Sequence, residues 1–399
     1  MNSHFNFRKL YISVVFPIYV ISNLLSASTF AFAAEGEINN FARLLSYLRY
    51  LIYIISIFFA CTRQIKKHPL VYASLLSLLV IICLYFNRNV QLICALFVFW
   101  ALVDFKWEII LRKQYFVSMI VVLVFLCFSQ IGLIEDFIRN DGRIRHFLGF
   151  NWTTYAPIIW FFVTVGSLCL NSTGKFLKQS VGLGLIAYIL YKLTGTRLAF
   201  GLTVLSIILF LLFGHIKKHK AKFRALTSIT ICSPFLCAIV SISAHALYSP
   251  DKPFFEKLNS LLSQRLYLGK MGIMNYGISL FGQKIVWKGF DRNTFTFADY
   301  NYVDCTYLHL LLEFGLVFLI VYLVILTIGI IKAYKNEKYY MCWALCLLCI
   351  LGMTEPWLLN FTFNPFMFCG VALFQKSKTV VDNRITLISG KQCNRGQVL

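Results

Sequence analysis

The sequence has little charge and very little acid. Of its 399 residues, 14% are charged, and only 16 are Asp or Glu against 38 Lys or Arg. Hydrophobic residues make up 59% of the chain, and proline occurs only 8 times. A soluble globular domain averages about 25% charged residues, so this composition excludes one. It is typical of a chain that is embedded in a lipid bilayer.

Several motifs of enzyme chemistry are also missing. The sequence has no Asp-x-Asp and no Cys/His spacing for a metal. It also has no Gly-rich phosphate loop and no Gly-x-Ser-x-Gly turn. We therefore predict no metal site and no cofactor. The 13 cysteines lie mostly inside apolar runs, where they act as small apolar residues. A site that handles phosphate would have to neutralise its charge with arginine.

Long apolar runs are what the chain has in abundance. A helix needs ~20 apolar residues to cross the hydrocarbon core, and about twelve such runs (10–12) can be placed. They are 10–30, 42–61, 69–86, 90–104, 115–134, 151–170, 179–193, 198–214, 226–248, 304–331, 339–353 and 357–375. We expect an all-α polytopic membrane protein, with residues 1–399 forming a single integral membrane domain.

The basic residues predict the orientation. Lys and Arg gather in alternate short loops, which places the N-terminus and the tail 376–399 in the cytoplasm. This charge is spread over many loops and forms no single patch, so it does not indicate binding of nucleic acid. One long polar stretch, 249–303, falls on the opposite, extracytoplasmic side. Long loops are usually functional or disordered, and its aromatic content and helical periodicity predict an ordered loop with short amphipathic helices.

Arginine and lysine are distributed differently between the two sides. Lysine predominates in the cytoplasmic segments, whereas arginine predominates outside, at Arg43, Arg88, Arg139, Arg143, Arg145, Arg197, Arg265 and Arg292. Orientation needs only charge, but a guanidinium group also binds phosphate or carboxylate through two parallel hydrogen bonds. The pattern favours an anionic ligand at the outer face, and headgroups of the outer leaflet are the alternative.

Three groups of these arginines are candidates for diphosphate binding. Arg143 and Arg145 flank a loop and either bind phosphate or pair with nearby acids. Arg197 begins a helix after the turn at Gly195, where free N–H groups favour anions; alternatively it is a topological anchor. Arg265 falls on the apolar stripe of a helix predicted to run from Phe254, where its charge needs an anionic partner or reaches a headgroup.

Acid–base candidates cluster where the chain re-enters the membrane. Asp304 lies at the water boundary, and His309 and Glu313 follow on one helical face, so Asp304 and His309 are the candidate general bases. Glu313 is either a supporting residue or half of a structural ion pair. Glu355 lies at the hairpin of the last two spans and either lines the same cavity or forms a turn. Tyr307 is one of several tyrosines that offer a stacking surface for sugars, Tyr267, Tyr276, Tyr300 and Tyr302 being the others.

Three stretches resemble the Wzy-type polysaccharide polymerases of the O-antigen ligase and polymerase superfamily. They are Thr194-Gly-Thr-Arg197-Leu-Ala-Phe, the segment from Leu261-Leu-Ser-Gln-Arg265 to Leu280-Phe-Gly-Gln-Lys284, and Tyr302-Val-Asp304-Cys-Thr-Tyr-Leu-His309-Leu-Leu-Leu-Glu313-Phe-Gly-Leu. The run from Glu355 through Asn360 to Asn364-Pro-Phe is also typical of that group. The chain departs from the ligases in having Asp304 where they carry His, and Cys305 where Asn follows.

This resemblance implies a metal-independent glycosyltransferase in a bacterial plasma membrane. Its substrates would be oligosaccharides on polyprenyl diphosphate, and its partners would be membrane lipid, a flippase and a chain-length regulator. Arg143, Arg145, Arg197 and Arg265 would stabilise the diphosphate leaving group while Asp304 or His309 accepts a proton. The product stays open among capsule, exopolysaccharide and O-antigen. A flippase for lipid-linked oligosaccharide and a ligase-like transferase are the alternatives.

Overall fold

The computed structural model describes residues 7–32, 39–61, 67–88, 90–140, 142–171, 176–216, 220–289 and 300–368. Its elements, in chain order, are η1 Tyr11–Val15, α2 Phe16–Ser26, η2 Thr29–Ala31, α3 Asn40–Cys61, α4 Lys67–Asn87, α5 Val90–Leu102, α6 Trp107–Gln130, β1 Ile138–Asn140, β2 Ile144–His146, α7 Tyr155–Cys169, α8 Phe176–Thr194, α9 Arg197–Ile216, α10 Lys220–Ser228, η3 Ile229–Cys232, α11 Ser233–Leu247, α12 Pro253–Leu261, α13 Arg265–Tyr276, α14 Thr306–Glu313, α15 Gly315–Lys335 and α16 Tyr339–Leu351. Arg292 and the predicted tail 376–399 lie outside these ranges.

The fold is mainly helical and has the features of an all-α membrane protein. Within the described part of the chain, six helices are long and apolar enough to cross a membrane: Phe7–Ser26, Asn40–Cys61, Trp107–Gln130, Arg197–Gly214, Ala221–Leu247 and Gly315–Lys335. Shorter apolar helices, α7 and α16 among them, complete the bundle. Every predicted span except the last coincides with one or more helices, although the count of about twelve crossings remains a prediction.

Two of the predicted spans differ from the structure. Residues 357–368, the described part of the last predicted span, form turns and a short 3-10 segment and no long helix. The predicted span 304–331 is divided into α14 and α15 at Phe314 and Gly315. Gly315 has a φ of +89°, which only glycine adopts readily, so the helix cannot continue through it. An apolar run cannot reveal such a break by hydropathy alone.

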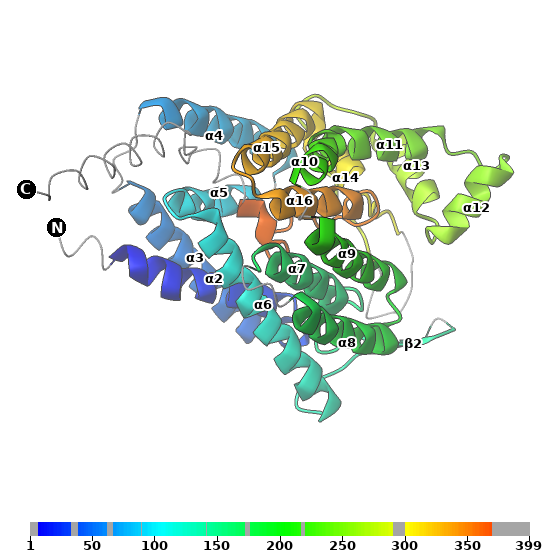
Figure 1. Cartoon of the computed structure of the whole chain (residues 1–399), viewed down its shortest axis with the longest axis horizontal. Helices are drawn as coiled ribbons and strands as arrows, with labels where there is room; N and C mark the ends of the chain where they lie inside the picture. The colour runs from blue at the N-terminus through cyan, green and yellow to red at the C-terminus, as the bar shows by residue number, and fades with distance from the viewer. Residues whose placement is uncertain are drawn as a thin grey trace, which may run out of the picture.

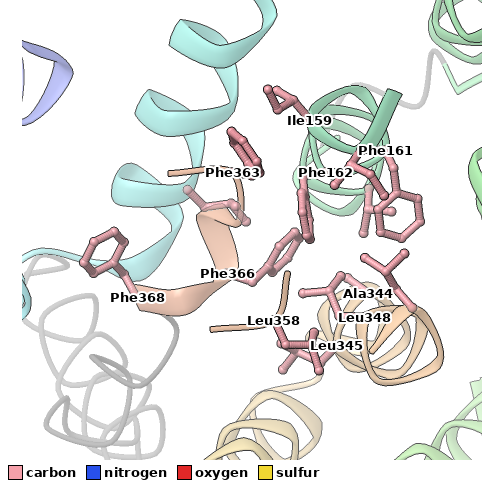
Figure 2. Packing of buried hydrophobic residues seen from close by; sticks show 14 of the residues in the cluster. Ile159, Phe161, Phe162, Ala344, Leu345, Leu348, Leu358, Phe363, Phe366 and Phe368 are labelled. Atoms are coloured by element: carbon pink, nitrogen blue, oxygen red, sulfur yellow. The ribbon is translucent and has the colours of Figure 1, made fainter. Parts of the chain in front are cut away.

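The core centres on α7, which is buried on all sides from Ala156 to Leu168. A helix that is apolar all round is expected at the middle of a bundle, and α7 packs against α6, α8, α9 and α16. Figure 2 shows its side chains meeting those of α16 and of the segment that follows α16, including Phe363 and Phe366. This packing holds the segment after Leu351 inside the bundle, although it is not a helix.

The predicted loop 249–303 contains two short helices, α12 and α13, and its residues 290–299 lie outside the described ranges. In Figure 1 these helices lie at the right, at the opposite end of the bundle from the start of α2, and β2 lies toward the same end. The expectation of a single helix running from Phe254 through Arg265 is wrong. Ser263 and Gln264 have positive φ angles of 56° and 67°, which end α12, and Arg265 begins α13.

Candidate functional site

Arg265 is held between two carboxylates that come from distant parts of the chain. Its Nε donates to Asp304 Oδ2 at 3.0 Å, and its Nη2 donates to Glu355 Oε1 at 2.9 Å. The second oxygen of Glu355 accepts a hydrogen bond from Trp357 Nε1 at 3.0 Å. We call Arg265, Asp304, Glu355 and Trp357 the Arg265 cluster. Both oxygens of Glu355 are therefore engaged, whereas Oδ1 of Asp304 has no hydrogen-bond partner among the described residues.

Asp304 meets Glu355 because the start of α14 is fastened to the end of α16. The N–H of Thr306 donates to the carbonyl of Gly352 at 2.9 Å, and the Thr306 hydroxyl donates to the carbonyl of Glu355. At the next residue, the Tyr307 hydroxyl donates to the carbonyl of Cys349 at 2.8 Å. Cys305 caps the helix by accepting from the N–H of Leu308 through its sulfur. These bonds hold the start of α14, and with it Asp304, close to Glu355.

Small residues bring α13, and with it Arg265, close to the bundle. A Cβ added at Gly269 would lie 1.9 Å from His245 Cδ2 of α11, and one added at Gly272 would lie 2.9 Å from Val303 Cγ2. Both glycines are buried, and they lie one turn apart on the same side of α13. Glycine is therefore required at both positions for α13 to approach α11 and α14. Arg265 is placed next to Asp304 by this close contact.

The electrostatics of the Arg265 cluster are set by burial. Burial would lower the pKa of Arg265, but Glu355 and Asp304 outweigh it and raise the pKa above its usual value, so the guanidinium is charged. Burial raises the pKa of Glu355 above its ordinary value of 4.5; Arg265 opposes this shift, and the charge of Asp304 adds to it. The exposed fraction of the Asp304 side chain is 21%, against 4% for Glu355. Asp304 is the more accessible carboxylate.

A second group of side chains surrounds His309. Its Nε2 lies 2.9 Å from Glu313 Oε2, and the same carboxylate oxygen accepts a hydrogen bond from Trp287 Nε1 at 2.8 Å. The Trp287 and His309 rings stack with their centroids 4.7 Å apart. The partner that Glu313 meets is thus His309, one turn earlier on α14. We call Trp287, His309 and Glu313 the His309 cluster.

Tyr302 lies between the two clusters. Its ring centroid is 5.7 Å from that of His309 and 6.0 Å from that of Trp287. Burial raises the pKa of Tyr302 well above its usual value, and the charges of Asp304 and Glu313 both add to this shift. The Tyr302 hydroxyl is therefore a neutral group close to both carboxylates. The two clusters form one continuous polar region at this end of the bundle.

The break between α14 and α15 is held by residues 279–282 of the long loop. The N–H groups of Leu316 and Val317 donate to the carbonyls of Ser279 and Leu280 at 3.0 and 3.1 Å. A Cβ added at Gly315 would lie 2.4 Å from the nitrogen of Gly282. The stretches around Gly282 and Gly315, which belong to separate motifs in the sequence, are therefore in direct backbone contact. This contact orients Glu313 toward Trp287.

Two arginines lie opposite each other on a short hairpin. Strands β1 and β2 pair antiparallel, and Arg139 is the cross-strand partner of Arg145. Directly paired residues share one side of a sheet, where like charges are destabilising. Arg145 Nε donates to the carbonyl of Thr194 at 3.0 Å, and the Arg139 guanidinium lies 5.6 Å from the centroid of the Trp152 ring. The hairpin thereby brings Arg145 beside the Thr194–Gly195 turn that precedes Arg197.

The predicted diphosphate residues occupy different environments. Arg145 and Arg197 are brought to the same turn, where Gly195 has the positive φ, +64°, that a sharp reversal requires. Arg143 is exposed between the strands, and Arg197 is exposed at the start of α9. The described hydrogen-bond partners of Arg265 are the two carboxylates. No cluster of three or more His, Cys, Asp or Glu that could hold a metal ion occurs among the residues described.

Tyr307, which the sequence suggested as a supporting residue, has a structural role. The Tyr307 side chain is fully buried (0% exposed), so it presents no surface to a sugar and instead ties α14 to α16. Sequence reasoning placed Arg139 only among the outer arginines, and it missed Trp287 and Trp357 as parts of the polar region. Only the hairpin register could have identified Arg139. Trp357 follows Glu355 by two residues, which is a local signal, whereas Trp287 is placed by tertiary packing alone.

Comparisons with protein-family models, with curated proteins and with solved structures find no match for this chain.

Proposed function

We propose that the protein is a membrane glycosyltransferase that polymerises oligosaccharide repeat units carried on polyprenyl diphosphate at the outer face of the plasma membrane. The observation that carries this proposal is the surroundings of Tyr300. Asp304, Arg265, Glu355 and Arg139 all influence the pKa of its hydroxyl, which burial raises. A candidate base, its Arg265 partner and one arginine of the hairpin, Arg139, thus lie near one tyrosine. This combination suits a reaction between a sugar hydroxyl and a diphosphate ester.

Asp304 is the proposed general base. Its Oδ2 is held by Arg265, and its Oδ1 is available to accept a proton from the attacking hydroxyl of the acceptor sugar. Glu355 engages both of its oxygens, so it acts as the positioning residue that fixes the guanidinium group. His309 shares its Nε2 with Glu313 and stacks on Trp287, which suits it to binding and orienting a sugar ring rather than to deprotonation.

The hairpin arginines are proposed to bind the diphosphate. Arg139 and Arg145 project from one side of the hairpin, and an anion between them would remove the repulsion of the two like charges. Arg197, at the N-terminus of α9, adds a third cation near free backbone N–H groups. Exposed Arg143 contributes attraction at longer range.

The proposed reaction forms one glycosidic bond and breaks the bond that joins the donor sugar to its diphosphate. The oxygen of the acceptor hydroxyl attacks the anomeric carbon of the donor glycan, and its proton passes to Asp304. The bond between that carbon and the diphosphate oxygen breaks, and the electron pair leaves with the diphosphate. The arginines stabilise the charge that develops on this leaving group, so the reaction needs no metal in this scheme.

The decisive experiment uses the purified full chain in detergent, where transport has no meaning. Lipid extracts from cells that lack this protein supply single lipid-linked repeats, and mass spectrometry follows their conversion to longer oligomers. We expect oligomers with the native chain and none with Asp304→Asn. If the native chain leaves single repeats unchanged but moves labelled repeats across vesicle membranes, the protein is a transporter and the proposal fails.

A further inference from the structure

A polar cavity of about 340 Å³ lies among α2, α3, α5 and the segment after Leu358. Its lining includes Arg49 of α3, Tyr19 of α2 and Asn360. Ligand pockets in proteins typically measure ~300–1,000 Å³, so the cavity is large enough for a lipid headgroup. None of the residues lining it is acidic.

Arg49 brings a charge to this cavity that no carboxylate of the lining balances. Its Nη1 donates to Ser26 Oγ at 3.2 Å and its Nη2 to Ser46 Oγ at 3.1 Å, and these neutral hydroxyls are its hydrogen-bond partners in the described structure. Arg49 lies within α3, ~14 Å along the helix axis from Asn40 at 1.5 Å per residue. A charge inside a membrane span is costly unless it pairs with a counter-charge. The missing counter-charge points to an anionic ligand.

Two other polar groups of the lining, the Tyr19 hydroxyl and the Asn360 amide nitrogen, have no hydrogen-bond partner among the described residues. Tyr19 is only 2% exposed, and its hydroxyl makes no hydrogen bond with any described residue. Asn360 Oδ1 accepts from the N–H groups of Thr362 and Phe363, which leaves its amide nitrogen as a donor for a ligand. Buried polar groups normally have partners, so the cavity is organised for a ligand that accepts hydrogen bonds.

The cavity reaches the surface of the bundle at Tyr50, which lines it and is 58% exposed. The neighbouring side chains Tyr47, Leu51 and Ile54 on α3 are also exposed and apolar or aromatic, as expected of a helix surface that faces lipid. A ligand that enters there comes from the bilayer, so its anionic group must be carried by an amphiphile. We propose that this cavity binds the phosphate group of a membrane lipid, with Arg49 as its principal contact.

This site is distinct from the Arg265 cluster, but it borders the same segments. Phe314 lines the cavity and directly follows Glu313 of the His309 cluster. Residues 359–362 also line it, a few positions after Glu355. The proposal does not depend on glycosyl transfer, because it concerns only which lipid the cavity holds. The source of the phosphate is either a glycerophospholipid or a polyprenyl diphosphate, and the test separates the two.

The test measures lipid binding to the full chain by native mass spectrometry in detergent. Three probes are added separately: farnesyl diphosphate, the neutral alcohol farnesol, and phosphatidylglycerol. We expect Arg49→Ala to weaken binding of a phosphate-bearing probe at least tenfold and to leave farnesol unchanged. Loss with farnesyl diphosphate alone assigns the site to polyprenyl diphosphate, and loss with phosphatidylglycerol assigns it to a glycerophospholipid. Equal binding of both phosphate probes to Arg49→Ala and to the native chain overturns the proposal.

Two further variants guard against an effect on folding. Arg43→Ala makes the same change of charge at an exposed position near the start of α3, outside the cavity, and should bind all three probes like the native chain. Arg49→Lys keeps the charge but loses the planar fork, so its binding should lie between those of the native chain and Arg49→Ala. If Arg49→Ala does not purify as a folded protein, Arg49→Gln takes its place under the same criteria.

Discussion

Arg265 Nε and Asp304 Oδ2 are 3.0 Å apart, which joins the first residue of α13 to the residue that precedes the cap of α14. Glu355 completes the arrangement from a third segment. One guanidinium group thus holds the positions of two carboxylates, and removing it would leave both uncompensated in a partly buried site.

Replacement of Arg265 should abolish chain extension. Removing one partner of a buried charge pair typically costs ~3–5 kcal/mol, and here it also frees Asp304 to move. We expect Arg265→Ala to lower oligomer formation in the detergent assay by at least about 100-fold, while Arg265→Lys retains part of the activity. Lys257→Ala, a change of the same sign at an exposed position on α12, is the control and should behave like the native chain. Normal product length in Arg265→Ala would show that the cluster has no part in the reaction.

Substitutions of Arg139 and Arg145 should weaken donor binding more than substitution of the exposed Arg143. Arg139→Ala and Arg145→Ala remove cations that share one side of the hairpin, so each should raise the KM for the lipid-linked donor about tenfold, equivalent to ~1.4 kcal/mol of binding energy. Arg143→Ala removes an exposed charge and should raise the KM far less. Equal effects of the three substitutions would indicate a diffuse electrostatic attraction without a site.

Glu355 should make stability depend on pH. Its pKa is raised in the folded state, chiefly by burial, so folding favours the protonated form. The stability that this contributes is fully present below its ordinary value of 4.5 and is lost as the pH rises through the folded value. The melting temperature of the native chain in detergent should therefore fall across that window relative to Glu355→Gln. Parallel melting curves for the two proteins at every pH would contradict the raised pKa.

The contact between Gly282 and Gly315 should tolerate no side chain. Alanine at position 315 would combine a left-handed backbone with a Cβ 2.4 Å from the nitrogen of Gly282, and we expect a loss of at least ~2 kcal/mol of stability. Gly329, on the same membrane helix, has open space where a Cβ would lie, so Gly329→Ala should be neutral or slightly stabilising. Thermal unfolding of the two variants compares them directly, and similar melting temperatures would refute the expectation.

The packing of α13 on α11 can be tested with a substitution and a second substitution that compensates for it. Gly269→Ala places a methyl group against the His245 ring, which we expect to cost ~1–3 kcal/mol and to displace Arg265. Adding His245→Ala makes room for the methyl group, so the double variant should recover part of both stability and activity. A double variant no better than Gly269→Ala would place the effect elsewhere.

The helices and the contacts between residues one turn apart could be predicted from the sequence. Contacts between distant parts of the chain could not. Apolar runs located the helices of the bundle, and six of these helices are long and apolar enough to cross a membrane. The pairing of His309 with Glu313 follows from their spacing of one turn. By contrast, Glu355 lies 90 positions from Arg265, and only the bonds from Thr306 to the end of α16 bring them together.

The same limit explains the three wrong expectations for helices. Hydropathy carries no information on left-handed backbone conformations. The predicted helices therefore continued through Gly315 and through the turn at Ser263 and Gln264. The residues after Glu355 are as apolar as a span, but they fill the interior as turns against α7. Apolar composition indicates burial; it does not specify whether the buried backbone is helical.

The division at Gly315 also bears on how the chain is assembled. The insertion machinery meets α15 as a strongly apolar segment of 21 residues with no acidic side chain. His309 and Glu313 precede that segment and belong to a separate short helix. The apolar segment that is long enough to cross the membrane therefore contains neither side chain, and substitutions at His309 or Glu313 leave its hydropathy unchanged.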